Sequence, residues 1–194
     1  MYIVPGIASS DYLNLKGCID FADKEYGKLH LTIADGHFVP RITFGMRAAL
    51  QICQYAKSRI SFHMLVTNPL QYLDEIALCY PDIVFLHLTS MPFPLEVIRQ
   101  FRAKGIPVGL ALTPAEDLGP LRYLMGEVDA VLQMTYEPNE HEFLESLYPK
   151  IDQLVKTGLP VWLDGGITDA MVHDLEKRGA AALVMGSSLF RRKA

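Results

Sequence analysis

Residues 29–45, LHLTIADGHFVPRITFG, carry the pattern that the rest of the chain repeats. The segment begins with alternating residues, so that His30 and Thr32 share one face of a predicted strand. It breaks at the turn-forming pair Asp35-Gly36. The sequence therefore predicts a strand that carries His30 and Thr32 towards a loop.

Short apolar runs of this kind recur along the chain with amphipathic segments between them. The runs that read as strands cover residues 2–8, 29–34, 60–66, 83–88, 107–112, 130–134, 160–164 and 181–186. The segments that read as helices lie near residues 12–26, 44–55, 70–79, 95–103, 118–125, 140–156 and 170–177. Strands that alternate with helices pair in parallel. Eight such units predict an α/β fold and favour a closed barrel over an open doubly wound sheet.

Only residues 187–194 follow the eighth predicted strand. We therefore expect the last helix of the barrel to be short or absent. Apolar surface between the first and seventh helices would then be uncovered, which is poorly tolerated on a monomer. This predicts a homo-oligomer, or cover by the tail at residues 191–194.

Composition bounds the class of protein. The 194 residues are 50% hydrophobic and contain no low-complexity linker, which predicts a single domain over residues 1–194. The formal charge of −4 and the scattered basic residues exclude an obvious nucleic-acid partner. The chain shows neither a basic leader nor an apolar run approaching the roughly 20 residues that span a bilayer. We expect no membrane association and a cytoplasmic protein with three free, buried thiols.

Three metal-capable side chains end three separate predicted strands: His30, His63 in ISFHML, and Asp164 in LPVWLDGGI. Alone, each is more often a hydrogen-bonded or turn residue. Function in parallel barrels collects at the carboxyl ends of the strands, however, and these three all lie there. Two imidazoles and one carboxylate suit zinc or a similar divalent ion and leave coordination positions open.

Glycines follow the last two predicted strands. LDGGIT places Gly165 and Gly166, and VMGSS places Gly186 and Ser187, where backbone N–H groups can approach an anion. Either motif alone is weak, because glycine pairs are common in turns. Barrels of this kind often bind phosphate after strands seven and eight, so the two motifs together predict a phosphate site.

These residues carry a family resemblance. Residues 29–45 resemble the signature H-x-D-x-M-D-G-x-F-V-P-N-x-x-x-G of ribulose-phosphate 3-epimerases, and SFHMLVTNP resembles that family's D-x-H-L-M-V-x-x-P. Further similarities follow in family order, namely IVFLHL, GLALTP, VLQMTYEP, LDGGI and MGSSLF. The resemblance implies a TIM (β/α)8 barrel of the ribulose-phosphate-binding type. It also implies a phosphorylated ketose as substrate, and loss of its C3 proton through a metal-stabilised enediolate.

Carried over residue by residue, His30, His63 and Asp164 match three of the family's four metal ligands, and Asp164 also matches one of its two catalytic acid/bases. The fourth ligand and second base falls on Thr32, whose hydroxyl is a far weaker base and brings no negative charge. The resemblance further implies substrate contacts by His63, Met134 and the four glycine-loop residues. Zinc is the expected ion, with iron or manganese as alternatives. We expect it to bind more weakly than in a four-ligand site, or to be lost on purification.

Other departures from the family gather near the same predicted mouth. Gly6 stands where the family has a serine, and the loop EPNEHEF replaces a glycine-rich loop. His87, Glu137 and His141 are candidate newcomers to a polar site, although each alone is more often structural or exposed.

Two classes of function therefore stay open. One is a ribulose-phosphate 3-epimerase-like isomerase acting on a ketose phosphate, with activity expected to be impaired by Thr32. The other is a non-catalytic sugar-phosphate-binding or regulatory paralogue. Thr32 and the replaced loop favour the second, whereas the retained histidines and Asp164 favour the enzyme, which is our leading hypothesis. A barrel decarboxylase is disfavoured because the sequence holds no D-x-K-x-x-D array.

Overall fold

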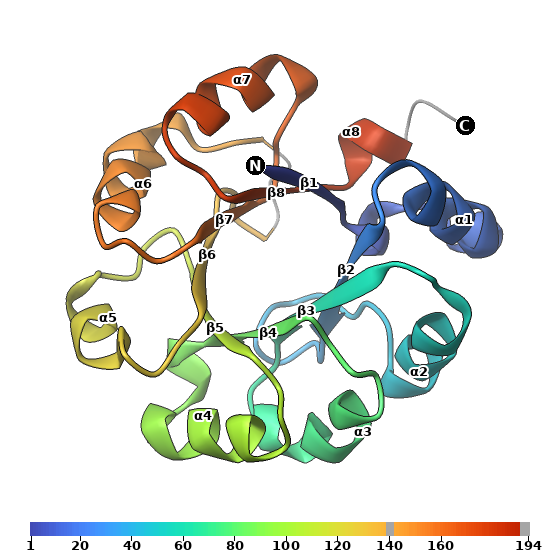
Figure 1. Ribbon diagram of the computed structural model, residues 1–194, viewed down its shortest axis with the longest axis horizontal. Helices are drawn as coiled ribbons and strands as arrows, with labels where there is room; N and C mark the ends of the chain where they lie inside the picture. Colours follow the sequence, from blue (N-terminus) through green and yellow to red (C-terminus); the bar gives the residue numbers. More distant parts are fainter. Residues whose placement is uncertain (139–141, 191–194) are drawn as a thin grey trace.

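Parallel strands form a barrel surrounded by helices in the computed structural model of the protein (Figure 1). The structure describes residues 1–138 and 142–190. Within these residues the strands are β1 (Tyr2–Pro5), β2 (Lys28–Ala34), β3 (Arg59–Leu65), β4 (Ile83–His87), β5 (Val108–Leu112), β6 (Ala130–Met134), β7 (Val161–Asp164) and β8 (Ala182–Met185). The helices are α1 (Leu15–Glu25), α2 (Met46–Tyr55), α3 (Leu73–Ala77), α4 (Pro94–Ala103), α5 (Gly119–Leu124), α6 (Tyr148–Val155), α7 (Asp169–Lys177) and α8 (Ser187–Phe190). The predicted TIM barrel is confirmed.

The strand order is β1-β8-β7-β6-β5-β4-β3-β2, and every pair in it is parallel. Between β1 and β2 a single parallel bridge from Gly6 to His30 closes the ring. His30 therefore lies at the seam of the barrel, where the first strand meets the second.

The barrel interior is filled by side chains that alternate along the strands. Phe85, Leu132 and Trp162 belong to the inner cluster, while a second, larger cluster packs between strands and helices. Gly109 of β5 makes room for Phe85, because a Cβ there would lie 2.4 Å from the Phe85 ring. Apolar side chains fill the interior, and the polar inward-facing residues lie at the carboxyl ends of the strands, where the site forms.

Two predicted helices begin later than expected. The segment from Tyr12 starts as a 3₁₀ turn, and α1 begins only at Leu15. The helix expected from residue 140 begins at Tyr148, with Pro149 in its first turn. Proline is favoured in a first turn because the N–H that it lacks has no partner there.

The closing helix α8 is short, as predicted, but the groove beside it is not empty. Leu189 and Phe190 are buried, and the Phe190 ring packs edge-on against Phe21 of α1 with centroids 6.2 Å apart. Figure 1 shows α8 between α1 and α7. Because α8 covers part of this groove, the expectation that it lies open is corrected. The tail at residues 191–194 falls outside the described residues.

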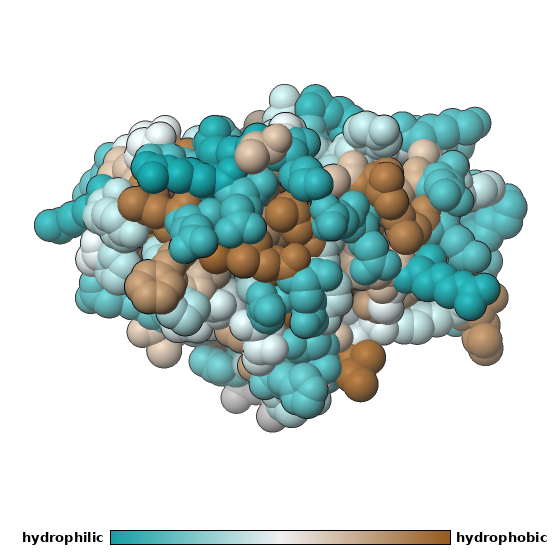
Figure 2. Space-filling model, turned by 90° about the horizontal axis from the view of Figure 1, so that it is seen from below, coloured by the Kyte–Doolittle hydropathy of each residue, from teal (hydrophilic) through white to brown (hydrophobic). Residues whose placement is uncertain are grey.

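Apolar side chains are exposed elsewhere on the surface. Leu78, Tyr80 and Phe93 lie near α3 and α4 and are 66%, 89% and 74% exposed. Figure 2 views this side and shows apolar patches enclosed by polar side chains. Among the described residues no helix is both long and apolar enough to cross a membrane.

Candidate functional site

Three side chains from distant parts of the sequence meet at the carboxyl end of the barrel. His30 of β2, His63 of β3 and Asp164 of β7 each offer one donor atom, and these atoms lie within 4.8 Å of one another. Oδ2 of Asp164 is 3.0 Å from Nδ1 of His63 and 4.0 Å from Nε2 of His30. The convergence expected from the strand ends is observed.

The hydrogen bonds of His30 leave one ring nitrogen free. Ser61 Oγ donates to the carbonyl of Leu29, at 3.3 Å, and lies 2.8 Å from Nδ1 of His30. Because the hydroxyl has one proton, Nδ1 must carry the hydrogen that joins the two side chains. Nε2 is then bare, buried and unpartnered among the described residues, and it faces Asp164. Burial lowers the pKa of His30 to about 4, which keeps the ring neutral at pH 7.

His63 also contacts a second buried histidine. Its Nε2 lies 2.8 Å from Nε2 of His87 on β4, and the two ring planes are inclined by 29° with centroids 5.0 Å apart. Burial lowers the pKa of His87 well below its usual value, and electrostatic repulsion from His63 lowers it further. Nδ1 of His87 lies 4.0 Å from Oε2 of Glu116, in the loop after β5. His87 is thus a member of the polar site, as the sequence hinted, and Glu116 is one that the sequence reasoning missed.

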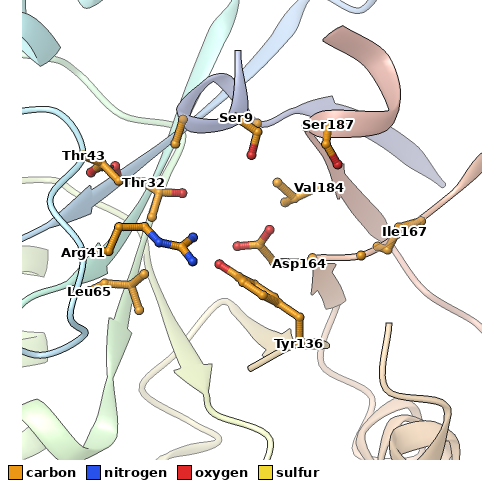
Figure 3. A pocket seen from close by; sticks show the side chains of 15 residues that line it. Ser9, Thr32, Arg41, Thr43, Leu65, Tyr136, Asp164, Ile167, Val184 and Ser187 are labelled. Atoms are coloured by element: carbon orange, nitrogen blue, oxygen red, sulfur yellow. Dashed lines mark hydrogen bonds between the residues drawn. The ribbon is translucent and has the colours of Figure 1, made fainter. Parts of the chain in front are cut away.

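A cavity of about 260 Å³ lies above these side chains (Figure 3). Its floor includes Asp164, and Thr32 lies on one wall. The predicted phosphate-loop residues line it too: Gly165, Gly166, Gly186 and Ser187. Of the other predicted substrate contacts, His63 and Met134 are 0% and 1% exposed and are not among the described residues that line the cavity. The cavity thus brings the two glycine loops and Asp164 to one space.

The two glycine loops are shaped by close packing. Gly165 has φ +113°, and a Cβ there would lie 1.9 Å from the ring of Tyr136. At Gly186 a Cβ would lie 2.7 Å from the Cβ of Ser9. Ser188 Oγ donates to the carbonyl of Ile167 at 3.0 Å, which joins the loops after β7 and β8. Glycine is needed at both positions for the loops to reach the cavity.

Arg41 and Tyr136, which the sequence reasoning missed, also line the cavity. Arg41 donates to the carbonyl of Pro138 and is hydrogen-bonded to Tyr136. Burial and the nearby Asp164 charge raise the pKa of Tyr136 to about 12, against the opposing effect of Arg41. Figure 3 shows Arg41 on the same side of the cavity as Thr32 and Leu65, across Asp164 from Ser187. One signal was available for Arg41, since it stands where the quoted family signature has asparagine.

Asp35, at the predicted turn after β2, and the candidate Glu137 are not among the described residues that line the cavity. Asp35 accepts hydrogen bonds from His37, Phe38 and Thr67. Desolvation raises its pKa, but these hydrogen bonds outweigh it and lower the pKa to about 2. Glu137 is exposed, and His141 lies outside the described residues.

Comparison with known proteins connects this geometry to a family. The model of the Ribulose-phosphate 3 epimerase family matches residues 2–190. A rice protein named ribulose-phosphate 3-epimerase, cytoplasmic isoform, is 32% identical over 97% of this chain and 86% of its own length. Ribulose-phosphate 3-epimerases of Helicobacter pylori (strain J99) and Bacillus subtilis are each 27% identical, over 100% and 97% of this chain and 92% and 91% of their own lengths.

Solved structures show the same fold at low identity. A phosphoribosyl anthranilate isomerase from Thermus thermophilus aligns with a TM-score of 0.70 and 19% identity, over 97% of this chain and 88% of its own. A mutant tryptophan synthase α-subunit from Pyrococcus furiosus aligns with a TM-score of 0.75 and 17% identity, over 98% and 88%. These likenesses concern the barrel architecture alone.

Proposed function

The chain belongs to the ribulose-phosphate 3-epimerase family, and we propose that it binds a ketose phosphate and acts on the proton at C3 through Asp164. The observation that carries this proposal is the position of Asp164. Its carboxylate contacts His63 on one side and faces a cavity lined by two glycine loops on the other. A sugar whose phosphate occupies those loops would present its carbon chain to Asp164.

The residues present fit a divalent cation. The set offers one bare imidazole nitrogen of His30, one nitrogen of His63 and one carboxylate oxygen of Asp164. Two imidazoles and a carboxylate suit zinc, iron or manganese, with zinc the ion that we propose. Such an ion would stabilise the negative charge that develops on the enediolate oxygen of the substrate. Without a carboxylate at residue 32, we propose that it is held less firmly than by four protein ligands.

Asp164 would take the C3 proton. Its side chain is 12% exposed and lies at the cavity floor, where a carboxylate can reach a bound sugar while being shielded from bulk water. In the absence of a cation, a hydrogen bond from Nδ1–H of His63 orients the carboxylate. The backbone of the loops after β7 and β8 would hold the phosphate at a fixed distance from this base.

Inversion at C3 needs a second proton donor on the opposite face of the sugar. Thr32 lies across the cavity from the glycine loops and pairs in register with His63. A threonine hydroxyl does not exchange protons with carbon acids efficiently, because its pKa is far from neutral. We therefore propose slow epimerisation, with one-sided exchange of the C3 proton as the main reaction.

A sugar-phosphate-binding or regulatory paralogue is the second candidate. Arg41 favours it, since its guanidinium links the loop after β2 to the loop after β6 across the cavity mouth. A protein that only binds the sugar phosphate needs the two glycine loops and the Arg41 guanidinium, but no second base.

One experiment separates the two candidates. Ribulose 5-phosphate is incubated with zinc-supplemented protein in D₂O, and NMR follows deuterium incorporation at C3 together with the appearance of xylulose 5-phosphate. Deuterium incorporation that Asp164→Asn abolishes supports the enzyme. Binding of the sugar by calorimetry without any incorporation supports the binder.

We also propose a homo-oligomer in the cytoplasm. The exposed apolar side chains near α3 and α4 support assembly, and the name of the rice relative supports the location. Light scattering that shows a monomer at micromolar concentration would contradict the proposed homo-oligomer.

A further inference from the structure

Four buried or nearly buried side chains form a continuous row beneath the cavity. Oδ2 of Asp164 is 3.0 Å from His63, whose Nε2 is 2.8 Å from Nε2 of His87, and Nδ1 of His87 is 4.0 Å from Glu116. Both histidine side chains are 0% exposed, and that of Glu116 is 13% exposed. The proposed function uses only the first two members of this row. His87 and Glu116 are left without a role.

In the absence of a cation, a hydrogen bond from His63 to Asp164 fixes one arrangement of the neutral rings along the row. If Nδ1–H of His63 donates to Asp164, its Nε2 is bare and must accept from Nε2–H of His87. Nδ1 of His87 is then also bare and faces the Glu116 carboxylate, so two acceptors meet. Nδ1 of His87 and Oε1 of Glu116 are indeed unpartnered among the described residues. Buried polar atoms without partners are costly.

A cation at Nδ1 of His63 reverses this arrangement. The His63 proton must then sit on Nε2, from where it donates to Nε2 of His87. The His87 proton moves to Nδ1, which faces Glu116. Nδ1 of His87 is then a donor that faces the Glu116 carboxylate, and two acceptors no longer face each other. No proton is gained or lost by the rings. The row therefore has two tautomeric states, and only the second has a lone pair free for a ligand bond.

We propose that Glu116 is a positioning residue that acts through His87 to select the His63 tautomer whose Nδ1 is free to bind a divalent cation. The inference rests on the cation site of the proposed function. In a common pattern, a carboxylate orients a metal-binding histidine directly. Here a second histidine, His87, lies between the carboxylate and the metal-binding histidine.

Glu116 is held in place for this role. Its Oε2 accepts a hydrogen bond from the backbone N–H of Thr113, which ties the carboxylate to the end of β5. Lys150 of α6 donates to the carbonyls of Thr113 and Pro114 at 3.0 and 3.1 Å and secures the same loop. The carboxylate thus faces His87 from a fixed backbone.

The first test is zinc affinity. Chelator-stripped protein is titrated with zinc against a chromophoric competitor, for the wild type, Glu116→Gln and the matched control Asp117→Asn. Glu116→Gln keeps the side-chain shape and removes the charge, while Asp117 is exposed in the same loop. We expect Glu116→Gln to weaken zinc binding about tenfold or more, in the range seen when outer partners of metal ligands are removed, and Asp117→Asn to change it less than about twofold.

The second test reads the tautomers directly. ¹⁵N NMR of the imidazole nitrogens should show protons on His63 Nδ1 and His87 Nε2 in zinc-free protein, and on His63 Nε2 and His87 Nδ1 in the zinc-loaded protein. Unchanged tautomers on zinc binding would overturn the inference, as would equal zinc affinities of Glu116→Gln and Asp117→Asn. If the wild type binds no zinc, the proposed cation site itself fails. If it binds zinc and only the variant result is negative, that site stands and the role of Glu116 does not.

Discussion

Nδ1 of His63 lies 3.0 Å from Oδ2 of Asp164, although 101 positions separate the two residues in the sequence. Parallel strands bring them together because both are inward-facing residues near the carboxyl ends of their strands. Together with the bare Nε2 of His30, this pair defines the proposed cation site.

Replacing His30 tests that site. We expect His30→Ala to weaken zinc binding more than about 100-fold, because losing a ligand should cost more than losing an outer partner, and Ser61→Ala to weaken it about tenfold. Competition titration with a chromophoric chelator measures both. His37→Ala, at an exposed histidine, is the control and should bind zinc as the wild type does. Equal affinities of His30→Ala and the control would place the metal elsewhere.

The loop after β8 can be tested by replacing Gly186 in it and, as a control, Gly45 before α2. Both glycines have ordinary backbone conformations. A Cβ at Gly186 would lie 2.7 Å from Ser9, whereas one at Gly45 would meet nothing within 4 Å. We expect Gly186→Ala to lower the affinity for ribulose 5-phosphate at least about tenfold, since the loop must shift away from the cavity. Calorimetry measures the effect. Gly45→Ala should bind as the wild type does, and a similar loss in both variants would argue against a phosphate site here.

Arg41 is the cationic side chain among the described residues that line the cavity. We expect Arg41→Gln to raise the dissociation constant for ribulose 5-phosphate about tenfold and to reduce its dependence on salt, because a charge-assisted contact is lost. Arg47→Gln, on the exposed face of α2, is the control. If affinity is unchanged while the thermal midpoint falls, Arg41 only secures the loop that contains Pro138.

Asp35 gives a pH-dependent prediction about stability. Its pKa is lowered to about 2 in the folded protein, so its contribution is present above the unfolded value near 3.8 and is lost as the pH falls towards 2. We expect Asp35→Asn to lower the free energy of unfolding by about 1–2 kcal/mol at pH 7, because an amide cannot replace all of the charged hydrogen bonds. Urea unfolding should show a smaller difference at pH 2.5. Asp74→Asn, at a side chain 86% exposed, is the control; a difference independent of pH would contradict the assignment.

Much of the fold follows from the sequence because the signals are local. Alternation along residues 28–34 places His30 and Thr32 on one face, and the same period applies to His63 and Asp164. The convergence of these residues then follows from parallel pairing. Arg41, Tyr136 and Glu116 could not be placed in this way. They lie in loops, whose paths are set by contacts with distant residues such as Pro138 and Thr113 rather than by a repeating pattern.

The late start of α6 has a similar cause. The apolar pattern continues upstream of Tyr148, but Phe143 and Leu144 pack against the main core from a non-helical segment instead. Tertiary packing therefore overrides the local pattern there.

Thr32 carries the central claim, because it pairs in register with His63 and stands where the family signature has aspartate. A carboxylate there would add a ligand and supply the missing acid/base on the far face of the sugar. The decisive measurement is the initial rate of ribulose 5-phosphate epimerisation by Thr32→Asp, with Thr32→Asn as the uncharged control of similar size. A positioned acid/base is worth about 10²–10⁴ in rate, so we expect Thr32→Asp to exceed both the wild type and Thr32→Asn by at least about tenfold. A wild-type rate that Thr32→Asp does not increase would contradict the account.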